Sequence, residues 1–240
     1  MDTAIFIVVL FFYSLFKYGI KKILSPEEPK ISKSSSFNRK KGYEWAFFIS
    51  PDFWWANYFK NRIKQFNDDA SINSLKEYVI INNKANLILS ILITGLVFFA
   101  FTFDPESQIY KTLISAAVIR SISRSFEISL AFGRDVLQVS QNATGLKKFE
   151  RIKLAISSYF EIFIYFAAVY LVLPCGKGIS YAITSSLSVG TLTNVGFVFV
   201  SDHFVNNIAF VQVFTTLSLV VLSLASYLSR GDNYPSNNAL

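Results

Sequence analysis

Residues 85–103 read A-N-L-I-L-S-I-L-I-T-G-L-V-F-F-A-F-T-F, a stretch without one charged side chain. A helix of about 20 apolar residues is long enough to cross the roughly 30 Å hydrocarbon core of a bilayer. We therefore expect an all-α integral membrane protein with about five transmembrane helices. The other four candidate spans are residues 4–20, 109–132, 152–173 and 208–228.

The composition of the chain agrees with a membrane location. Of 240 residues, 52% are hydrophobic, 17% are aromatic and 16% are charged, whereas a soluble domain carries about 25% charged residues. With one Cys and one His, the chain has too few of these residues for a disulfide framework, or for a metal centre built on Cys and His ligands. We expect no cofactor and no enzymatic activity and, in spite of a net charge of +7, no nucleic-acid partner.

The basic residues predict the orientation. Residues 21–84 hold 12 Lys and Arg, and residues 133–153 hold five, whereas 104–108 and 174–204 share one, Lys177. Because basic loops stay in the cytoplasm, we expect the N-terminus outside and the C-terminus inside a bacterial-type inner or plasma membrane. The stretch before residue 22 has no basic n-region, so we expect a retained anchor helix in residues 1–22 rather than a signal peptide.

The segment 23–84 is expected on the cytoplasmic side. Its second part, residues 45–66, places many aromatic residues beside Lys60, Arg62 and Lys64. Aromatic rings next to basic side chains are typical of a helix at the membrane interface. A small cytoplasmic helical cap with an aromatic core is the alternative.

Several charges fall inside predicted spans, and such charges are functional candidates by default. Residues 85–151 are predicted to form two helices and a cytoplasmic loop, with Arg120, Arg124 and Glu127 in the second helix. Two basic residues are too few for a voltage sensor. We expect Glu127 to pair with Arg124, and Glu161 to pair with one of the two arginines; an ion or proton site at Glu161 is the alternative.

Residues 179–200 form a shorter uncharged stretch, rich in Ser, Thr and Gly. We interpret it as a re-entrant segment: a half-helix over 179–190 of roughly 16 Å, followed by extended backbone. The negative end of the helix dipole would then lie near the bilayer centre and favour a cation. Unpaired carbonyls at that depth are tolerated only where they line a cavity holding water or ions.

Residues 185–197 read S-S-L-S-V-G-T-L-T-N-V-G-F. This stretch resembles the pore helix and selectivity filter of two-transmembrane potassium channels, whose filter reads T-V-G-Y-G. Phe197 stands at the aromatic position of the family's pattern T-x-T-T-V-G-Y/F-G-D. Four further positions of that pattern are kept: Thr191, Thr193, Val195 and Gly196.

The resemblance implies that residues 152–230 are a pore domain and residues 231–240 a C-terminal tail. It implies a homotetramer in membrane lipid that conducts K⁺ or another monovalent cation through a pore loop. The implied ion-filter residues are Thr193, Asn194, Val195, Gly196 and Phe197. The polar residues of the last span that would line the pore cavity are Gln212, Thr215 and Thr216.

Three departures from the family pattern keep other readings open. Asn194 stands in place of a Thr, and Val198 and Phe199 replace the second Gly and the Asp. A filter needs residues with positive φ, which Gly adopts freely and which costs another residue about 1–2 kcal/mol. The alternatives are a non-conducting anchor or interaction protein built on a degenerate channel fold, a membrane protein that works through residues 25–84, and a small-residue helix that only packs against its neighbours.

Overall fold

The computed structural model describes residues 3–25, 46–64, 69–137, 145–172, 178–195 and 203–224. The elements found in these residues are all helical, which confirms the predicted all-α class. A 3-10 turn, Tyr170–Val172, follows α6, and a π-helical segment, Ser218–Leu224, continues α8. The α-helices are α1 (Thr3–Leu24), α2 (Ala46–Ile49), α3 (Pro51–Lys64), α4 (Asp69–Phe103), α5 (Gln108–Leu137), α6 (Lys148–Val169), α7 (Gly178–Gly190) and α8 (His203–Leu217).

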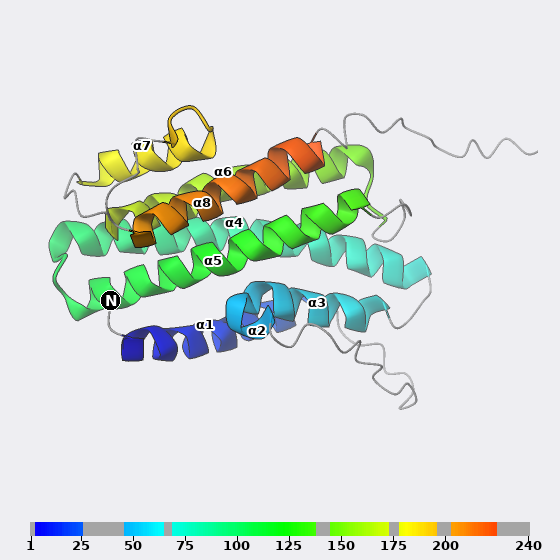
Figure 1. Ribbon diagram of the computed structural model, residues 1–240. Helices are drawn as coiled ribbons and strands as arrows, with labels where there is room; N and C mark the ends of the chain where they lie inside the picture. Colours follow the sequence, from blue (N-terminus) through cyan, green and yellow to red (C-terminus); the bar gives the residue numbers. More distant parts are fainter. Residues whose placement is uncertain are drawn as a thin grey trace, which may run out of the picture.

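The long helices lie side by side along one axis (Figure 1). Helices α4, α5, α6 and α8 form the body of the bundle, and α1 with α2 and α3 covers one side of it. Helix α7 lies on the opposite side, where it packs against α6 and α8. Helices α6–α8 cover most of the stretch predicted as a pore domain, and we refer to them as the pore-like unit. Helices α1 and α3 form an additional layer on the bundle.

Three helices are long and apolar enough to cross a membrane: Ala4–Leu24, Ser71–Phe103 and Lys148–Val169. A shorter apolar helix covers Asn206–Val221. The predicted span 109–132 is helical as part of α5, but it is not among these three, since it carries Arg120, Arg124 and Glu127. The finer layout of five spans and its orientation therefore stay predictions.

Helix α4 is longer than a bilayer requires. Its 35 residues measure about 52 Å at 1.5 Å per residue, so the boundary expected between residues 84 and 85 lies inside one continuous helix. The second half of α4 presents apolar side chains to the outside, as expected for a lipid-facing surface. These exposed residues are Ile88, Ile91, Leu92, Leu96 and Phe99.

The aromatic segment packs onto the bundle through α3. Phe59 and Ile63 are buried together with Leu75 and Tyr78 of α4. The ring of Trp55 lies 4.6 Å from that of Tyr18 on α1, centroid to centroid. This packing supports the predicted alternative of a helical cap with an aromatic core.

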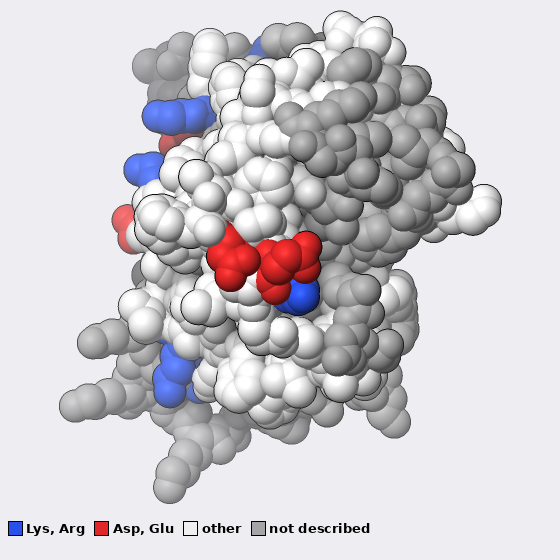
Figure 2. All heavy atoms as spheres, turned by 90° about the vertical axis from the view of Figure 1, so that its left-hand side faces the viewer, with Lys and Arg blue, Asp and Glu red and all other residues white. Residues whose placement is uncertain are grey.

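The end of the bundle at the turn between α4 and α5 is mostly uncharged over its described surface (Figure 2). Acidic groups and a basic one lie together at the centre of this view, and further charged groups lie along its left edge. Asp104 and Glu106 are exposed in this turn, and Lys111 pairs loosely with Glu106 at 3.7 Å. A shortage of basic residues at this end agrees with the side that we expect to face outward.

Gly190, the last residue of α7, allows that helix to approach α6 and α8 closely. A Cβ at this position would collide with the ring of Phe163 on α6 and would lie 2.8 Å from Nε2 of Gln212 on α8. The backbone φ of Gly190 is not positive, so the backbone conformation does not require a glycine. Only the lack of space excludes a side chain here.

We predict that Gly190→Ala lowers the free energy of unfolding by about 1–3 kcal/mol, the cost of overpacking a close-packed site. Unfolding by SDS titration in neutral detergent, followed by circular dichroism, measures the loss. Gly95→Ala on α4 is the matched control because nothing lies within 4 Å of a Cβ there. An equal effect at the two glycines would contradict the tight contact at α7.

Candidate functional site

Helix α7 covers the stretch for which the sequence predicts a re-entrant half-helix. Its 13 residues measure about 20 Å, which is less than the hydrocarbon core of a bilayer. Three hydrogen bonds attach its C-terminal half to the neighbouring helices. Ser186 Oγ donates to the Phe163 carbonyl at 2.7 Å, Tyr159 Oη donates to the Gly190 carbonyl at 3.2 Å, and Gln212 Nε2 donates to the Ser186 carbonyl at 2.9 Å.

The chain turns back on α7 directly after its end. The amide of Thr191 donates to Leu187 O at 2.8 Å, and the amides of Thr193 and Asn194 both donate to Ser188 O, at 3.1 and 3.3 Å. Leu192 takes a left-handed conformation with φ of 60°. That conformation costs a residue with a Cβ about 1–2 kcal/mol.

The carbonyl groups of this turn, residues 191–194, accept no hydrogen bond within the part of the chain that the structure describes. Thr193 and Asn194 are exposed, and Val195 is partly buried. Three of the five predicted filter positions are therefore placed at the end of α7. The other two, Gly196 and Phe197, lie outside the described residues.

The predicted cavity residues do not face an open surface. Gln212, Thr215 and Thr216 are buried inside the chain, and Gln212 Oε1 accepts a hydrogen bond of 2.6 Å from Tyr170 Oη. Gln212 holds α8 to its neighbours, whereas Thr215 Oγ1 donates to the Val211 carbonyl of α8 itself at 2.7 Å. The expectation that the three residues line a pore cavity stays a prediction. The open face of α8 is formed instead by Phe210, Phe214, Leu217 and Val221.

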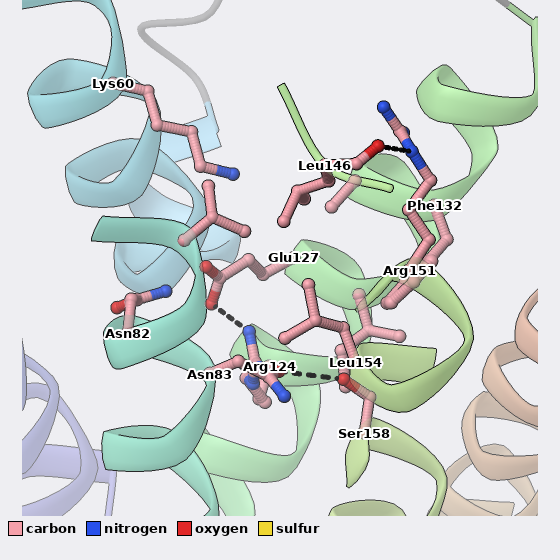
Figure 3. A pocket seen from close by; sticks show the side chains of 13 residues that line it. Lys60, Asn82, Asn83, Arg124, Glu127, Phe132, Leu146, Arg151, Leu154 and Ser158 are labelled. Carbon is pink, nitrogen blue, oxygen red and sulfur yellow. Dashed lines mark hydrogen bonds and ion pairs between the residues drawn. The ribbon is translucent and has the colours of Figure 1, made fainter. Parts of the chain in front are cut away.

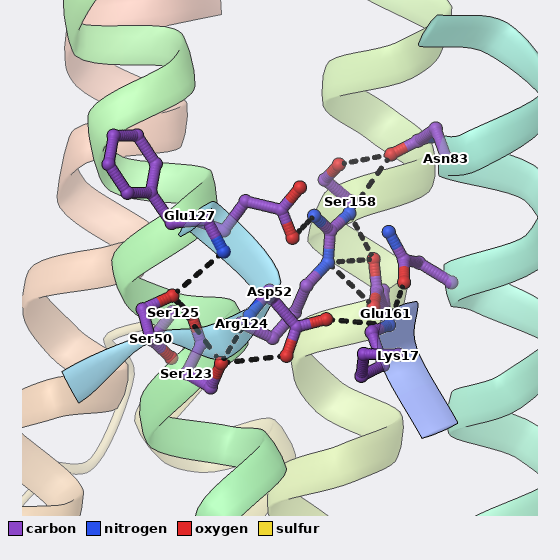
Figure 4. A network of polar contacts seen from close by, with 12 residues as sticks. Lys17, Ser50, Asp52, Asn83, Ser123, Arg124, Ser125, Glu127, Ser158 and Glu161 are labelled. Atoms are coloured by element: carbon purple, nitrogen blue, oxygen red, sulfur yellow. Dashed lines mark hydrogen bonds and ion pairs between the residues drawn. The ribbon is translucent and has the colours of Figure 1, made fainter. Parts of the chain in front are cut away.

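A buried network of charges crosses the bundle beside the pore-like unit (Figure 4). Glu161 on α6 accepts Arg120 Nη2 at 3.0 Å on one oxygen and Arg124 Nη2 at 2.9 Å on the other. Arg124 Nη1 also lies 2.7 Å from Glu127 Oε2. These contacts confirm both predicted pairings. They also make Glu161 a partner of two arginines at once.

The network extends to α1 and α3. Lys17 Nζ lies 2.6 Å from Asp52 Oδ1, and Lys21 Nζ lies 3.2 Å from Glu127 Oε1. Lys17 also donates to Asn86 Oδ1 at 2.7 Å. All of these side chains are almost completely buried. The network therefore joins α1, α3, α4, α5 and α6.

The local sequence explains how Asp52 reaches this position. Ser50 precedes α3 and accepts the amide of Phe53 at 3.0 Å, as an N-cap does, and Pro51 occupies the first helical position. Asp52 then lies in the first turn, where the helix dipole favours a carboxylate. Ser123 Oγ and Tyr13 Oη donate to Asp52 Oδ2 at 2.7 and 2.5 Å.

Lys17, Lys21 and Asp52 were not predicted as site residues. A signal for the two lysines is their four-residue spacing, which places both on one face of an otherwise apolar helix. A similar signal runs along α4, where Asn83, Asn86 and Ser90 recur at helical spacing and all join the network.

A cavity of about 120 Å³ opens between α3, α4, α5 and α6 next to this network. Lys60 reaches into it from α3, with its ammonium group above Glu127 (Figure 3). Among the described residues no carboxylate lies within ion-pair distance of Lys60 Nζ. Burial lowers the pKa of Lys60 from 10.5 to about 8. The polar lining is Lys60, Asn82, Asn83, Arg124, Glu127, Arg151 and Ser158.

The described residues hold no cluster of three or more His, Cys, Asp or Glu side chains able to bind a metal ion. Two features therefore stand out chemically: the unpaired carbonyls after α7 and the charge network with its cavity. A comparison of the chain with protein families, curated proteins and solved structures found no match.

We predict that Glu161→Gln lowers the free energy of unfolding by about 3–5 kcal/mol, because it leaves two buried arginines without their shared carboxylate. SDS titration in neutral detergent measures the change. Glu150→Gln on the same helix is the control, since Glu150 pairs with Lys76 in a partly exposed bridge that is worth about 0–1 kcal/mol. Similar losses in the two variants would contradict the network.

We predict that acetylation of Lys60 by acetic anhydride reaches its full rate at an unusually low pH. A lysine reacts as the neutral amine, and the lowered pKa of about 8 makes Lys60 mostly neutral above that pH. The rate should therefore be half-maximal near pH 8 and level off about one pH unit higher, where most of the lysine is neutral. Mass spectrometry of the Lys60 peptide measures the rate, with Lys60→Arg to identify the peak. A rate that still rises steeply near pH 10 would contradict this burial.

Proposed function

We propose that the protein is one subunit of a homotetrameric channel for monovalent cations. The ion path is built from α6, α7, the turn after α7, and α8. The observation that carries the proposal is the set of unpaired carbonyl oxygens at residues 191–194, exposed at the end of a helix too short to cross a bilayer. An unpaired carbonyl in the apolar part of a bilayer costs several kcal/mol unless it faces water or an ion.

The electrostatics of this end favour a cation. The C-terminus of a helix carries roughly half a negative charge. The turn at residues 191–194 follows directly after the C-terminus of α7. The carbonyls of the turn add their dipoles at the same place. Thr193 and Asn194 contribute a hydroxyl and an amide oxygen close by. No basic residue lies in residues 178–195 to oppose this field.

A single chain leaves this turn on its surface, so a path closed on all sides needs further copies. Exposed apolar side chains flank the turn, and another copy would cover them. They are Ile183 and Leu187 on α7, and Phe210, Phe214 and Leu217 on α8. Closed rotational symmetry, the usual solution for identical subunits, brings four such turns around one axis.

The remaining helices support the pore-like unit. Glu161 holds α6 to α5 through two arginines, and α5 is held to α1 through Glu127 and Lys21. Thr94 on α4 donates to the Ile164 carbonyl of α6 at 2.9 Å. In this proposal α1–α5 fix the position of α6, which in turn fixes α7.

We predict that purified protein in liposomes passes K⁺, Rb⁺ or Na⁺ down a gradient, and that Asn194→Asp changes the ratio of K⁺ to Na⁺ flux by about three-fold or more. Four added carboxylates near the path raise the field that an ion meets. The matched control is Asn73→Asp, the same substitution at an exposed position of α4.

Two results would contradict this prediction. A verified tetramer that passes none of the three ions under any gradient or voltage would overturn the channel proposal. So would flux that changes equally in Asn194→Asp and Asn73→Asp. Gly196→Asp provides a further variant that should abolish flux, because it places a charged side chain in the predicted filter.

A further inference from the structure

The cavity beside Lys60 has the size and lining of a binding site. Its volume of about 120 Å³ equals roughly four waters at about 30 Å³ each, which is enough for one tetrahedral oxyanion. It is partly open, and its rim includes Phe132 and Leu146 near the cytoplasmic ends predicted for α5 and α6. A small ligand from that side can enter it.

The charge of the region is unbalanced. The single acid in the lining, Glu127, uses one oxygen for Lys21 and the other for Arg124, so it does not neutralise Lys60. Lys60, Arg151 and the network together place six basic side chains against three acidic ones. These are Lys17, Lys21, Lys60, Arg120, Arg124 and Arg151 against Asp52, Glu127 and Glu161. A surplus of positive charge suits the charge of about −1.5 to −2 on a phosphate monoester.

The neutral side chains of the lining offer donors. Asn83 Oδ1 accepts from Ser158 Oγ at 3.0 Å and from Arg124 Nη2 at 3.2 Å, so its NH₂ group is left for a ligand. The amide of Asn82 has no hydrogen-bond partner among the described residues. Ammonium, guanidinium and amide N–H groups around one space suit an acceptor-only ligand such as a phosphate.

We propose that this cavity binds a phosphate group, with Lys60 as the principal ligand and the amides of Asn82 and Asn83 as further donors. The phosphate belongs either to a soluble phosphate compound or to the headgroup of an anionic lipid. Lys60 is half-buried and has no carboxylate as counterion within ion-pair distance among the described residues, and the bound phosphate supplies that counterion. The site is separate from the ion path and does not rest on conduction.

Protection of Lys60 from acetylation tests the site in the full chain. The first probe is inorganic phosphate, added to protein in neutral detergent at constant ionic strength. The second is a phosphatidylcholine bilayer with or without phosphatidic acid. Acetylation of Lys60 is compared with that of Lys64, an exposed lysine one turn later on the same helix. We expect about five-fold protection of Lys60 at saturation and none of Lys64.

The two arms separate the sources of the ligand. Protection by inorganic phosphate identifies a soluble ligand, and protection by phosphatidic acid alone identifies a lipid headgroup. Lys60→Gln should bind the same probe about ten-fold more weakly, measured by thermal stabilisation, and Lys64→Gln should bind it like the unaltered protein. No protection in either arm, or equal protection of the two lysines, would overturn the proposal.

Discussion

The carboxylate of Glu161 lies between two arginines inside a bundle whose outer surface is mostly apolar. None of these three charges is stable there alone, since removing one partner of a buried ion pair costs about 3–5 kcal/mol. The helices that carry them must therefore stay together. Because Arg124 also binds Glu127, and Glu127 binds Lys21, the same constraint reaches α1.

This constraint also determines where the pore-like unit can be placed. Glu161 is two residues before Phe163, whose carbonyl accepts the Ser186 hydroxyl of α7. Phe163 also fills the space left open at Gly190. The charges fix the position of α6 from one side. Hydrogen bonds and close packing between α6 and α7 then fix the position of α7. The turn after α7, whose carbonyls accept no hydrogen bond from the described residues, is thereby positioned by α6.

Strong local signals made much of the fold predictable from the sequence. Long apolar runs predicted α1, α4 and α6, and the short Ser/Thr-rich run predicted α7. Isolated charges in apolar helices predicted the pairing of Glu161 and of Glu127. The sequence did not predict which side of α8 is buried in the bundle, because apolar residues surround Gln212, Thr215 and Thr216 on all sides of the helix. Polar residues on such a helix can face an ion path or a neighbouring helix. In this chain all three are buried, and Gln212 bonds to Ser186 of α7 and to Tyr170.

Contacts between distant segments also could not be predicted from the sequence. Asp52 and Lys17 meet only because α3 folds back along α1, and nothing in either segment specifies that approach. The cavity at Lys60 depends on four helices and has no linear pattern. The filter positions remain predictions as a set, since Gly196 and Phe197 are placed by the sequence alone.

The central claim is that four copies of the turn after α7 surround one axis. Electron-spin distance measurements between labels at Asn194→Cys, in a Cys175→Ser background, test it directly. A square of four labels gives two short distances whose ratio is about 1.4, and labels at Phe99→Cys on the outer face of α4 give longer ones. A single distance, or longer distances at residue 194 than at residue 99, would contradict the claim.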